Sequence, residues 1–206
     1  MIRISSLFTI MIILFAVAGC KTKTEKPLPP PPLVRKEKGD SSGKQKGPII
    51  NVTDTIEQRR IVLCIKDSAS TSSGMSVKLS NIYNIKLPAA IKAGKLKMTG
   101  QPMAWYKTQK APFFFEAGIQ VEKAPAKLIK GSFIKTTGGD SALVAHFFGP
   151  NDLSIAGYDA LNEILKDRHK KKAAPSYEIY VKNPFELSKE KRDPYKTQTD
   201  IVMPYQ

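Results

Sequence analysis

Residues 141–184 read SALVAHFFGPNDLSIAGYDALNEILKDRHKKKAAPSYEIYVKNP, and they carry the clearest pattern of strands and helix in the chain. It starts with a short apolar run closed by Gly149-Pro150, which predicts a strand and a turn. Small and apolar residues then recur at spacings of three and four, which predicts an amphipathic helix capped by Asn151 or Asp152. This stripe consists of Leu153, Gly157, Ala160, Leu161, Ile164 and Leu165. Pro175 excludes further helix, so a second strand is expected after it.

The second strand, residues 176–183, carries the acid of greatest chemical interest, Glu178. Because strand side chains alternate, Glu178 and Tyr180 are expected on one face and Tyr177 and Ile179 on the other. A carboxylate that lines a cavity without a partner either takes up a proton or attracts a cation. Aromatic faces nearby favour the cation. The alternative is a surface glutamate that faces water or pairs with one of the many lysines.

The order of these motifs resembles a known family. His-x-x-Gly-Pro at 146–150 is followed by Tyr-Asp-Ala-Leu at 158–161, Pro-x-x-Glu-x-Tyr-Val at 175–181 and Asn-Pro at 183–184. This order is similar to the GyrI-like small-molecule-binding domain, which is also the effector-binding domain of multidrug-responsive and AraC-type transcription regulators. The resemblance implies an α+β fold of duplicated β-α-β-β units, with antiparallel sheet, two long helices and a pseudo-twofold ligand cleft. It also implies that Glu178 meets cationic aromatic ligands.

The chain before this stretch shows the same order of elements, so the domain at 48–206 is expected to consist of two halves, about 57–125 and 126–206. The first half is predicted to contain a strand at 58–66, a helix at 74–93 and strands at 102–108 and 113–121. Pro88 lies inside this helix, where we expect a kink or a break, and Gly94 is a natural stop. The second half is led by residues 127–136 and closed by a strand at 197–205.

Further candidate ligand-binding residues come from the paired strands of the first half. Aromatic side chains there and on the Glu178 strand are expected to form walls of the cleft, and a second acid matches the family's strand pattern. These candidates are Trp105, Tyr106, Phe115, Tyr180 and Glu116. Packing alone explains any single aromatic residue, and a structural or surface role is the alternative for Glu116.

The first 47 residues differ in character from the rest. Arg3, an apolar run at Leu7–Ala18 and the box Val17-Ala18-Gly19-Cys20 predict a lipoprotein signal peptide at 1–19, because the run is too short to span a bilayer. Cys20 is then expected to carry acyl chains such as palmitate, which would hold the protein on a membrane of the cell envelope. The alternative is an ordinary secretory signal with an incidental cysteine. Residues 20–47 are rich in Pro and Lys and are expected to be a tether, or else a proline-rich segment that binds a partner.

Net charge is +15, from 33 Lys and Arg against 18 Asp and Glu. We expect no nucleic-acid partner, since no helix-turn-helix pattern precedes the domain, and we expect attraction to anionic lipids or envelope polymers instead. No metal-ligand spacing, phosphate-binding loop or cofactor motif is present in the sequence. His146 is expected to be a hydrogen-bonded core residue, and Cys64 a buried apolar one.

Three functions are compatible with these residues. The one we favour is an anchored envelope lipoprotein that binds an amphipathic small molecule in an aromatic cleft, with a cation as one possible kind of ligand. The second is a hydrolase of reactive small molecules that uses the cleft glutamate on water. The third is a non-catalytic envelope protein whose partner is another protein.

Overall fold

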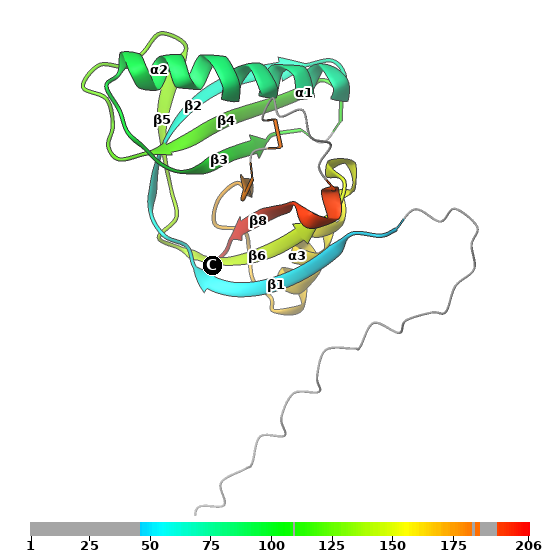
Figure 1. The fold of residues 1–206 in the computed structure, drawn as a ribbon. Coiled ribbons are helices and arrows are strands. Elements are labelled where there is room, and N and C mark those ends of the chain that lie inside the picture. Colours follow the sequence, from blue (N-terminus) through cyan, green and yellow to red (C-terminus); the bar gives the residue numbers. More distant parts are fainter. Residues whose placement is uncertain (1–45, 109, 183, 186–192) are drawn as a thin grey trace, which may run out of the picture. The chain divides into compact units, whose positions relative to one another are not determined.

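The structure, a computed structural model, describes residues 46–206 apart from 109, 183 and 186–192 (Figure 1). The expected signal peptide, Cys20 and nearly all of the expected tether lie outside these residues. Residues 45–206 form one compact unit, and the hydrophobic clusters described below lie within it. Among the described helices, none has the length and apolar character needed to cross a bilayer.

The described strands form one eight-stranded antiparallel sheet with the order β1-β6-β8-β7-β3-β4-β2-β5. The strands are β1 (Ile49–Ile56), β2 (Arg60–Ala69), β3 (Met98–Tyr106), β4 (Phe113–Val121), β5 (Ser132–Thr137), β6 (Ser141–Phe148), β7 (Tyr177–Tyr180) and β8 (Gln198–Pro204). The expected α+β class and antiparallel sheet are therefore confirmed.

The strand order shows the duplication directly. Each half contains a first strand, a helix and two more strands, and the third strand lies between the first and the second: β2-β4-β3 in one half and β6-β8-β7 in the other. The halves meet at the β7–β3 pair, where Ala104 lies opposite Glu178. The order is the same when read from either end, as a pseudo-twofold axis at the β7–β3 junction requires.

The outer strands join the two halves a second time. β1 leads into the first half but pairs with β6 of the second, whereas β5 leads into the second half but pairs with β2 of the first. The sequence-based prediction contains no strand at β1. Its sequence, IINVTDTI, is almost wholly exposed in the structure, and so it lacks the apolar run that marks a buried strand.

The first long helix is continuous but changes its winding. It runs as α1 (Ser72–Asn81), a π-helical turn (Ile82–Lys86) and α2 (Leu87–Ala93), and Gly94 ends it as expected. Pro88 lies in the first turn of α2, directly after the π-helical turn. A π-helical turn changes the hydrogen-bond spacing, so the helix passes Pro88 without the break that the sequence alone suggests.

The second long helix, α3 (Ile155–Asp167), begins differently from the prediction. A 3₁₀ turn at Asn151–Leu153 precedes it, and no side chain caps either element, so the expected cap by Asn151 or Asp152 is wrong. The apolar stripe is confirmed at Gly157, Leu161 and Leu165, which are buried. A short 3₁₀ helix at Pro194–Lys196 leads into β8.

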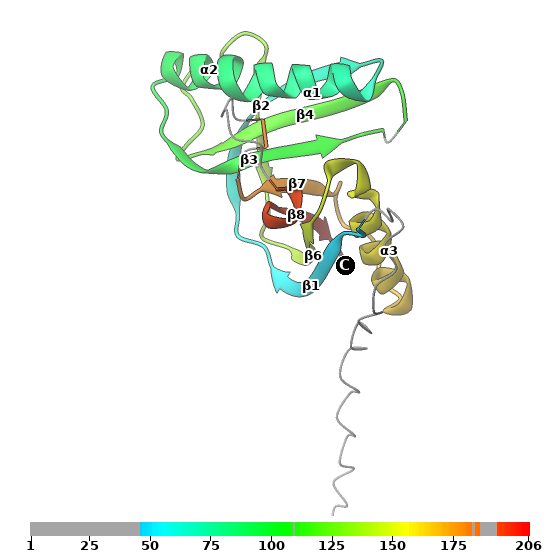
Figure 2. The same cartoon turned by 45° about the vertical axis from the view of Figure 1, so that its right-hand side comes forward.

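Three apolar clusters hold the sheet and helices together. One lies between α1–α2 and strands β2, β3 and β4, and another between α3 and strands β6 and β8, so both helices cover the same face of the sheet (Figures 1 and 2). The third cluster is on the opposite face. It joins Val62 and Cys64 of β2 to Ala142 and Val144 of β6, strands far apart in the sheet order, so the sheet curls around this cluster.

Candidate functional site

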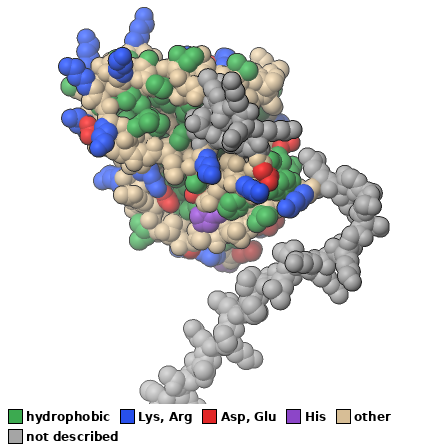
Figure 3. Space-filling view, viewed as in Figure 1, with side chains coloured by type: hydrophobic (Ala, Val, Ile, Leu, Met, Phe, Trp, Pro, Cys, Tyr) green, Lys and Arg blue, Asp and Glu red, His purple; other side chains and the backbone are tan. Residues whose placement is uncertain are grey.

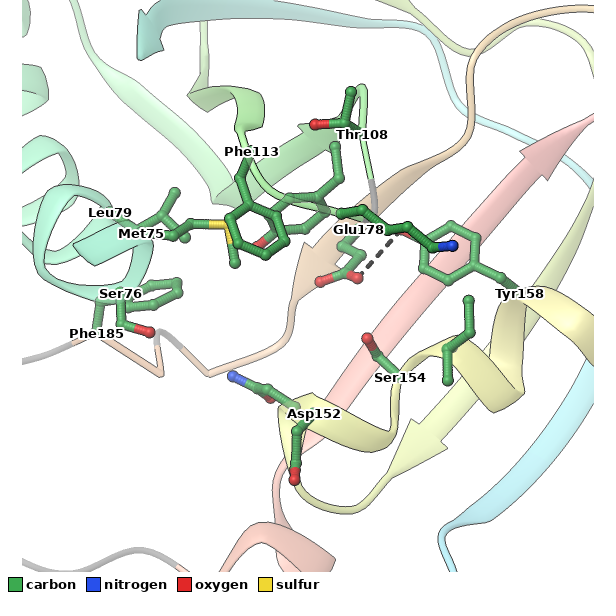
Figure 4. Close-up of a pocket in the computed structure, with 14 residues that line it drawn as sticks. Met75, Ser76, Leu79, Thr108, Phe113, Asp152, Ser154, Tyr158, Glu178 and Phe185 are labelled. Atoms are coloured by element: carbon green, nitrogen blue, oxygen red, sulfur yellow. Dashed lines mark hydrogen bonds between the residues drawn. The ribbon is translucent and has the colours of Figure 1, made fainter. Parts of the chain in front are cut away.

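A cavity of about 480 Å³ lies on the helix-covered face, over the junction of the two halves (Figure 4). It is bounded by α1, by the β3–β4 hairpin, by the start of α3 and by β7. Its lining residues are Met75, Ser76, Leu79, Tyr106, Thr108, Lys110, Phe113, Asn151, Asp152, Ser154, Ile155, Tyr158, Glu178 and Phe185. This volume is within the usual range for small-molecule sites.

Glu178 is the acid in the depth of this cavity. Glu178 is only 5% exposed, and it is one of the residues that line the cavity. The Tyr158 hydroxyl, on α3, donates to Glu178 Oε1 at 3.1 Å (Figure 4). A second hydrogen bond comes from Tyr180, two residues along β7 on the same face. The carboxylate is therefore oriented by two phenols, Tyr158 from α3 and Tyr180 from its own strand, β7.

A hydrogen-bonded tyrosine pair spans the junction of the halves. Tyr106, at the end of β3, and Tyr180 place their hydroxyl oxygens 2.5 Å apart. If Tyr180 donates to Glu178, its oxygen is free to accept from Tyr106, which gives a chain from Tyr106 through Tyr180 to the carboxylate. Tyr83 and Phe185 pack edge-on against the Tyr180 ring, with centroids 6.2 and 5.6 Å away. The position of the phenol chain is thus fixed by packing.

The environment of Glu178 favours its neutral form. Burial raises the pKa of its carboxyl to about 7, and the hydrogen bonds from Tyr180 and Tyr158 only partly oppose this. Among the described residues, no Lys, Arg or His forms an ion pair with Glu178. Lys110 lines the cavity but is exposed and does not contribute to this pKa shift. When Glu178 does ionise, its negative charge is therefore not neutralised by any cationic side chain among the described residues.

Two of the six predicted ligand-binding residues, Glu178 and Tyr106, line the cavity. Tyr180 is fully buried behind them and takes part through its hydroxyl. The expected orientation of the Glu178 strand is confirmed, because Tyr177 and Ile179 belong to the cluster on the opposite face.

The structure does not bring the other three to the cavity. Phe115 is buried in the core between α1–α2 and the sheet. Trp105 lies on the opposite face, with its ring centroid 5.4 Å from that of Tyr177. Glu116 lies opposite Trp105 in the β3–β4 pairing and shares that face. The expected walls at Trp105 and Phe115 and the second cleft acid at Glu116 are thus not part of this cavity.

Glu116 is a useful contrast to Glu178, since it is equally buried but has cationic partners. Lys135 and Lys107 approach its oxygens to 2.5 and 2.8 Å, and Lys66 lies 4.0 Å away. Burial alone would raise the pKa of Glu116, but the hydrogen bonds and charges of Lys107 and Lys135 bring it below its usual value. Its charge is satisfied within the protein.

Several lining residues were missed by the sequence-based prediction, among them Met75, Leu79, Phe113, Tyr158 and Phe185. Tyr158 was available as a signal, because it belongs to the Tyr-Asp-Ala-Leu motif and lies beside the buried stripe of α3. The others come from segments whose approach to Glu178 depends on how the two halves pack.

Titratable groups elsewhere are held in structural roles. His146 Nδ1 lies 2.7 Å from Asp200 Oδ1 and its Nε2 lies 3.1 Å from Thr53 Oγ1, so the expected hydrogen bonds are confirmed. The expected core position is wrong, because the side chain is 28% exposed beside these polar neighbours. Cys64 is fully buried, and burial raises the pKa of its thiol to about 12, as in an unreactive cysteine. Within the described ranges, no group of three His, Cys, Asp or Glu side chains is arranged to hold a metal ion.

Comparison with solved structures identifies the fold. The crystal structure of the EcmrR C-terminal domain aligns with a TM-score of 0.61 and 15% sequence identity, over 77% of this chain and 98% of that one. The fold is GyrI-like. EcmrR in its DNA complex aligns with a TM-score of 0.58 and 15% sequence identity, over 77% of this chain and 57% of that longer protein. An uncharacterised conserved protein from Listeria innocua aligns with a TM-score of 0.51, 9% identity and coverage of 75% of this chain and 92% of that one.

Comparison of sequences finds no match for this chain. No protein-family model matches it, and no curated protein matches it either.

Proposed function

We propose that the cavity binds a monovalent, amphipathic organic cation with aromatic or other apolar substituents. The observation that carries this proposal is Glu178, a buried carboxylate on the wall of an open cavity without a described cationic partner. A ligand cation would supply the missing charge, and apolar groups would contact Met75, Leu79 and Phe113. The GyrI-like fold is compatible with this use, since the cavity lies at the junction of its two halves.

The site also favours a single positive charge. At the β3–β7 junction, the residue opposite Glu178 is Ala104, so the pseudo-twofold arrangement does not supply a second carboxylate. Lys110 and Asp152 at the cavity edge are both exposed and therefore screened by water. We expect one cation per chain, with dications gaining little from the second charge.

The test compares two compounds of similar shape, methyltriphenylphosphonium and neutral triphenylphosphine oxide. At pH 8, Glu178→Gln should weaken binding of the cation by more than tenfold and binding of the neutral compound by less than threefold. Isothermal titration calorimetry measures both affinities. Glu116→Gln is the matched control, because it removes an equally buried carboxylate from the opposite face and should change neither affinity. Equal loss for both compounds in Glu178→Gln would refute a role for the carboxylate's charge.

A second candidate function is hydrolysis of a reactive small molecule. The observation that favours it is the pKa of Glu178, since a carboxyl with a pKa of about 7 has the proton affinity of a general base at neutral pH. The test is product formation from an aromatic epoxide at high protein concentration. Diol formation that is lost in Glu178→Gln would favour hydrolysis, and an unchanged epoxide would leave binding as the function.

We also propose that the protein is a lipoprotein of the bacterial cell envelope, acylated on Cys20. The support is the sequence alone: Arg3, the short apolar run and the small residues before Cys20. The test is metabolic labelling with an alkyne analogue of palmitate. Label on the wild-type chain that disappears in Cys20→Ser is expected, and an unlabelled wild type would exclude the anchor.

A further inference from the structure

We infer that the end of the molecule formed by the C-terminus of α2 and two loops binds an anionic lipid surface. The two loops are residues 94–97 and 122–131. We call the surface the lysine patch, and it consists of Lys92, Lys95, Lys97, Lys123, Lys127, Lys130 and Leu128. The inference does not depend on cation binding in the cavity or on acylation of Cys20.

The two loops form one surface because they are joined by specific contacts. The backbone N–H of Glu122 donates to the carbonyl of Lys97 at 3.1 Å, and the first residue of β3, Met98, pairs with Val121. Ile129 packs closely on Gly94 and, with Leu96, joins the core beneath α2. The loop at 122–131 is therefore fixed to the end of the helix, and its lysines are held together with those of the other loop.

The charge of the patch is mostly uncompensated. All six lysines are exposed, and the acid within these loops is Glu122, whose carboxylate lies 4.0 Å from Lys123. None of the other five lysines forms an ion pair with a described residue. Lys and Arg side chains gather at this end of the molecule in the upper left of Figure 3. By contrast, in the basic segment after α3, Arg168 is paired with Asp54.

An apolar residue at the centre of the patch selects lipid over other polyanions. Leu128 stands between Lys127 and Lys130 and is 57% exposed, while its neighbour Ile129 is turned into the core. Met98, which begins β3 beside these loops, is 53% exposed. Exposed apolar side chains flanked by lysines are suited to the headgroup region of an anionic bilayer, where the lysines meet phosphates and the apolar groups leave water. An acidic polymer would use only the charge.

The position of the patch leaves the cavity open to solvent. Met75 of the cavity lies near the start of α1 and the patch at the end of α2, roughly 27 Å apart at 1.5 Å per residue. With the lysine patch on a bilayer, the cavity would lie well above the headgroups. A chain of 25 residues before Lys46 can extend to at most roughly 85 Å, so an anchor at Cys20 is compatible with this orientation.

The experiment uses residues 45–206, the compact unit, which lacks Cys20, and a thermal melt verifies the fold of each variant. Partitioning is measured by co-sedimentation with vesicles of phosphatidylcholine alone or with 30 mol% phosphatidylglycerol, a composition chosen as roughly that of an anionic leaflet. The paired variant Lys127→Gln with Lys130→Gln should bind anionic vesicles about 25-fold more weakly, since each lysine near such a surface contributes about fivefold. The matched control, Lys171→Gln with Lys172→Gln, makes the same charge change at the far end of α3 and should lose less than about threefold.

Leu128→Ser separates lipid from other polyanions. It should weaken binding to anionic vesicles several-fold and leave binding to heparin unchanged. Equal losses in the two lysine variants, or binding to phosphatidylcholine as strong as to the anionic mixture, would overturn the inference. So would a Leu128→Ser variant with unchanged vesicle binding, which would assign the patch to acidic polymers.

Discussion

Replacing Glu178 by Gln should make the protein more stable at high pH, even though it removes the residue that we place at the centre of function. Gln has nearly the same size and keeps an oxygen that accepts from the phenols, but it does not ionise. In the wild type, the folded state holds the Glu178 proton more tightly than the unfolded chain, because its pKa rises from 4.5 to about 7 on burial. A raised carboxyl pKa lowers stability as pH rises from the unfolded value to the folded one.

The size of this effect follows from the shift. A difference of about 2.5 pKa units corresponds to about 3 kcal/mol at full ionisation, and about 2.5 kcal/mol of it develops between pH 5 and pH 8. The wild type should therefore lose about 2.5 kcal/mol more than Glu178→Gln over this interval. A buried acid that lowers the free energy of unfolding is expected where the residue serves ligand binding rather than folding.

Urea unfolding at pH 5 and pH 8, followed by far-UV circular dichroism, measures the free energy of unfolding of both proteins. Other titrating groups cancel in the comparison, since the two chains differ at one position. A wild type and variant with the same pH dependence would show that Glu178 is ionised at its ordinary pKa, and the electrostatic argument would fail.

Three further predictions test other parts of the structure. Glu116→Gln should destabilise the protein at pH 7 by about 1–2 kcal/mol, because Lys107 and Lys135 lose the negative charge and one of the two oxygens that they share. This loss should shrink in acid as the wild-type carboxyl protonates, and urea unfolding at pH 7 and pH 3 checks this. Tyr158→Phe should weaken binding of methyltriphenylphosphonium about tenfold at pH 8, since it removes one hydrogen bond that favours ionised Glu178. The melting temperature should change little. An unchanged affinity in calorimetry would exclude this role of Tyr158. Gly157→Ala should destabilise the protein by about 1–3 kcal/mol in urea unfolding, because a Cβ there would lie 2.5 Å from Cδ1 of the buried Ile201 side chain. An unchanged stability would mean that the Ile201 side chain turns aside or that α3 shifts away from β8.

Much of the fold could be predicted from local patterns. Strand alternation gave the orientation of Glu178 and Tyr180, and the stripe of Gly157, Leu161 and Leu165 gave the buried side of α3. Local patterns did not predict β1, because its side chains are almost wholly exposed. They also did not predict the π-helical turn that precedes Pro88 in the first long helix.

The candidate site was only partly predictable, for two physical reasons. Strand alternation also separates Trp105 from Tyr106 and Phe115 from Glu116, so neither pair of neighbours can line one cavity. Tyr106 and Phe115 share the helix-covered face, but α1 and α2 cover Phe115 and leave Tyr106 open. Which aromatic residues are covered depends on long-range packing between the halves, and a single sequence does not specify it.

The pH dependence of cation binding by the full domain tests whether ionised Glu178 recognises the ligand. If the ionised carboxylate of Glu178 binds the ligand cation, and its pKa is about 7, then about ten times more of the protein is competent at pH 8 than at pH 6. Calorimetry should therefore show methyltriphenylphosphonium binding about tenfold more tightly at pH 8 in the wild type, with no such change for triphenylphosphine oxide or in Glu178→Gln. Cation affinity that is the same at both pH values, or tighter at pH 6, would show that the buried carboxylate of Glu178 does not recognise the ligand through its charge.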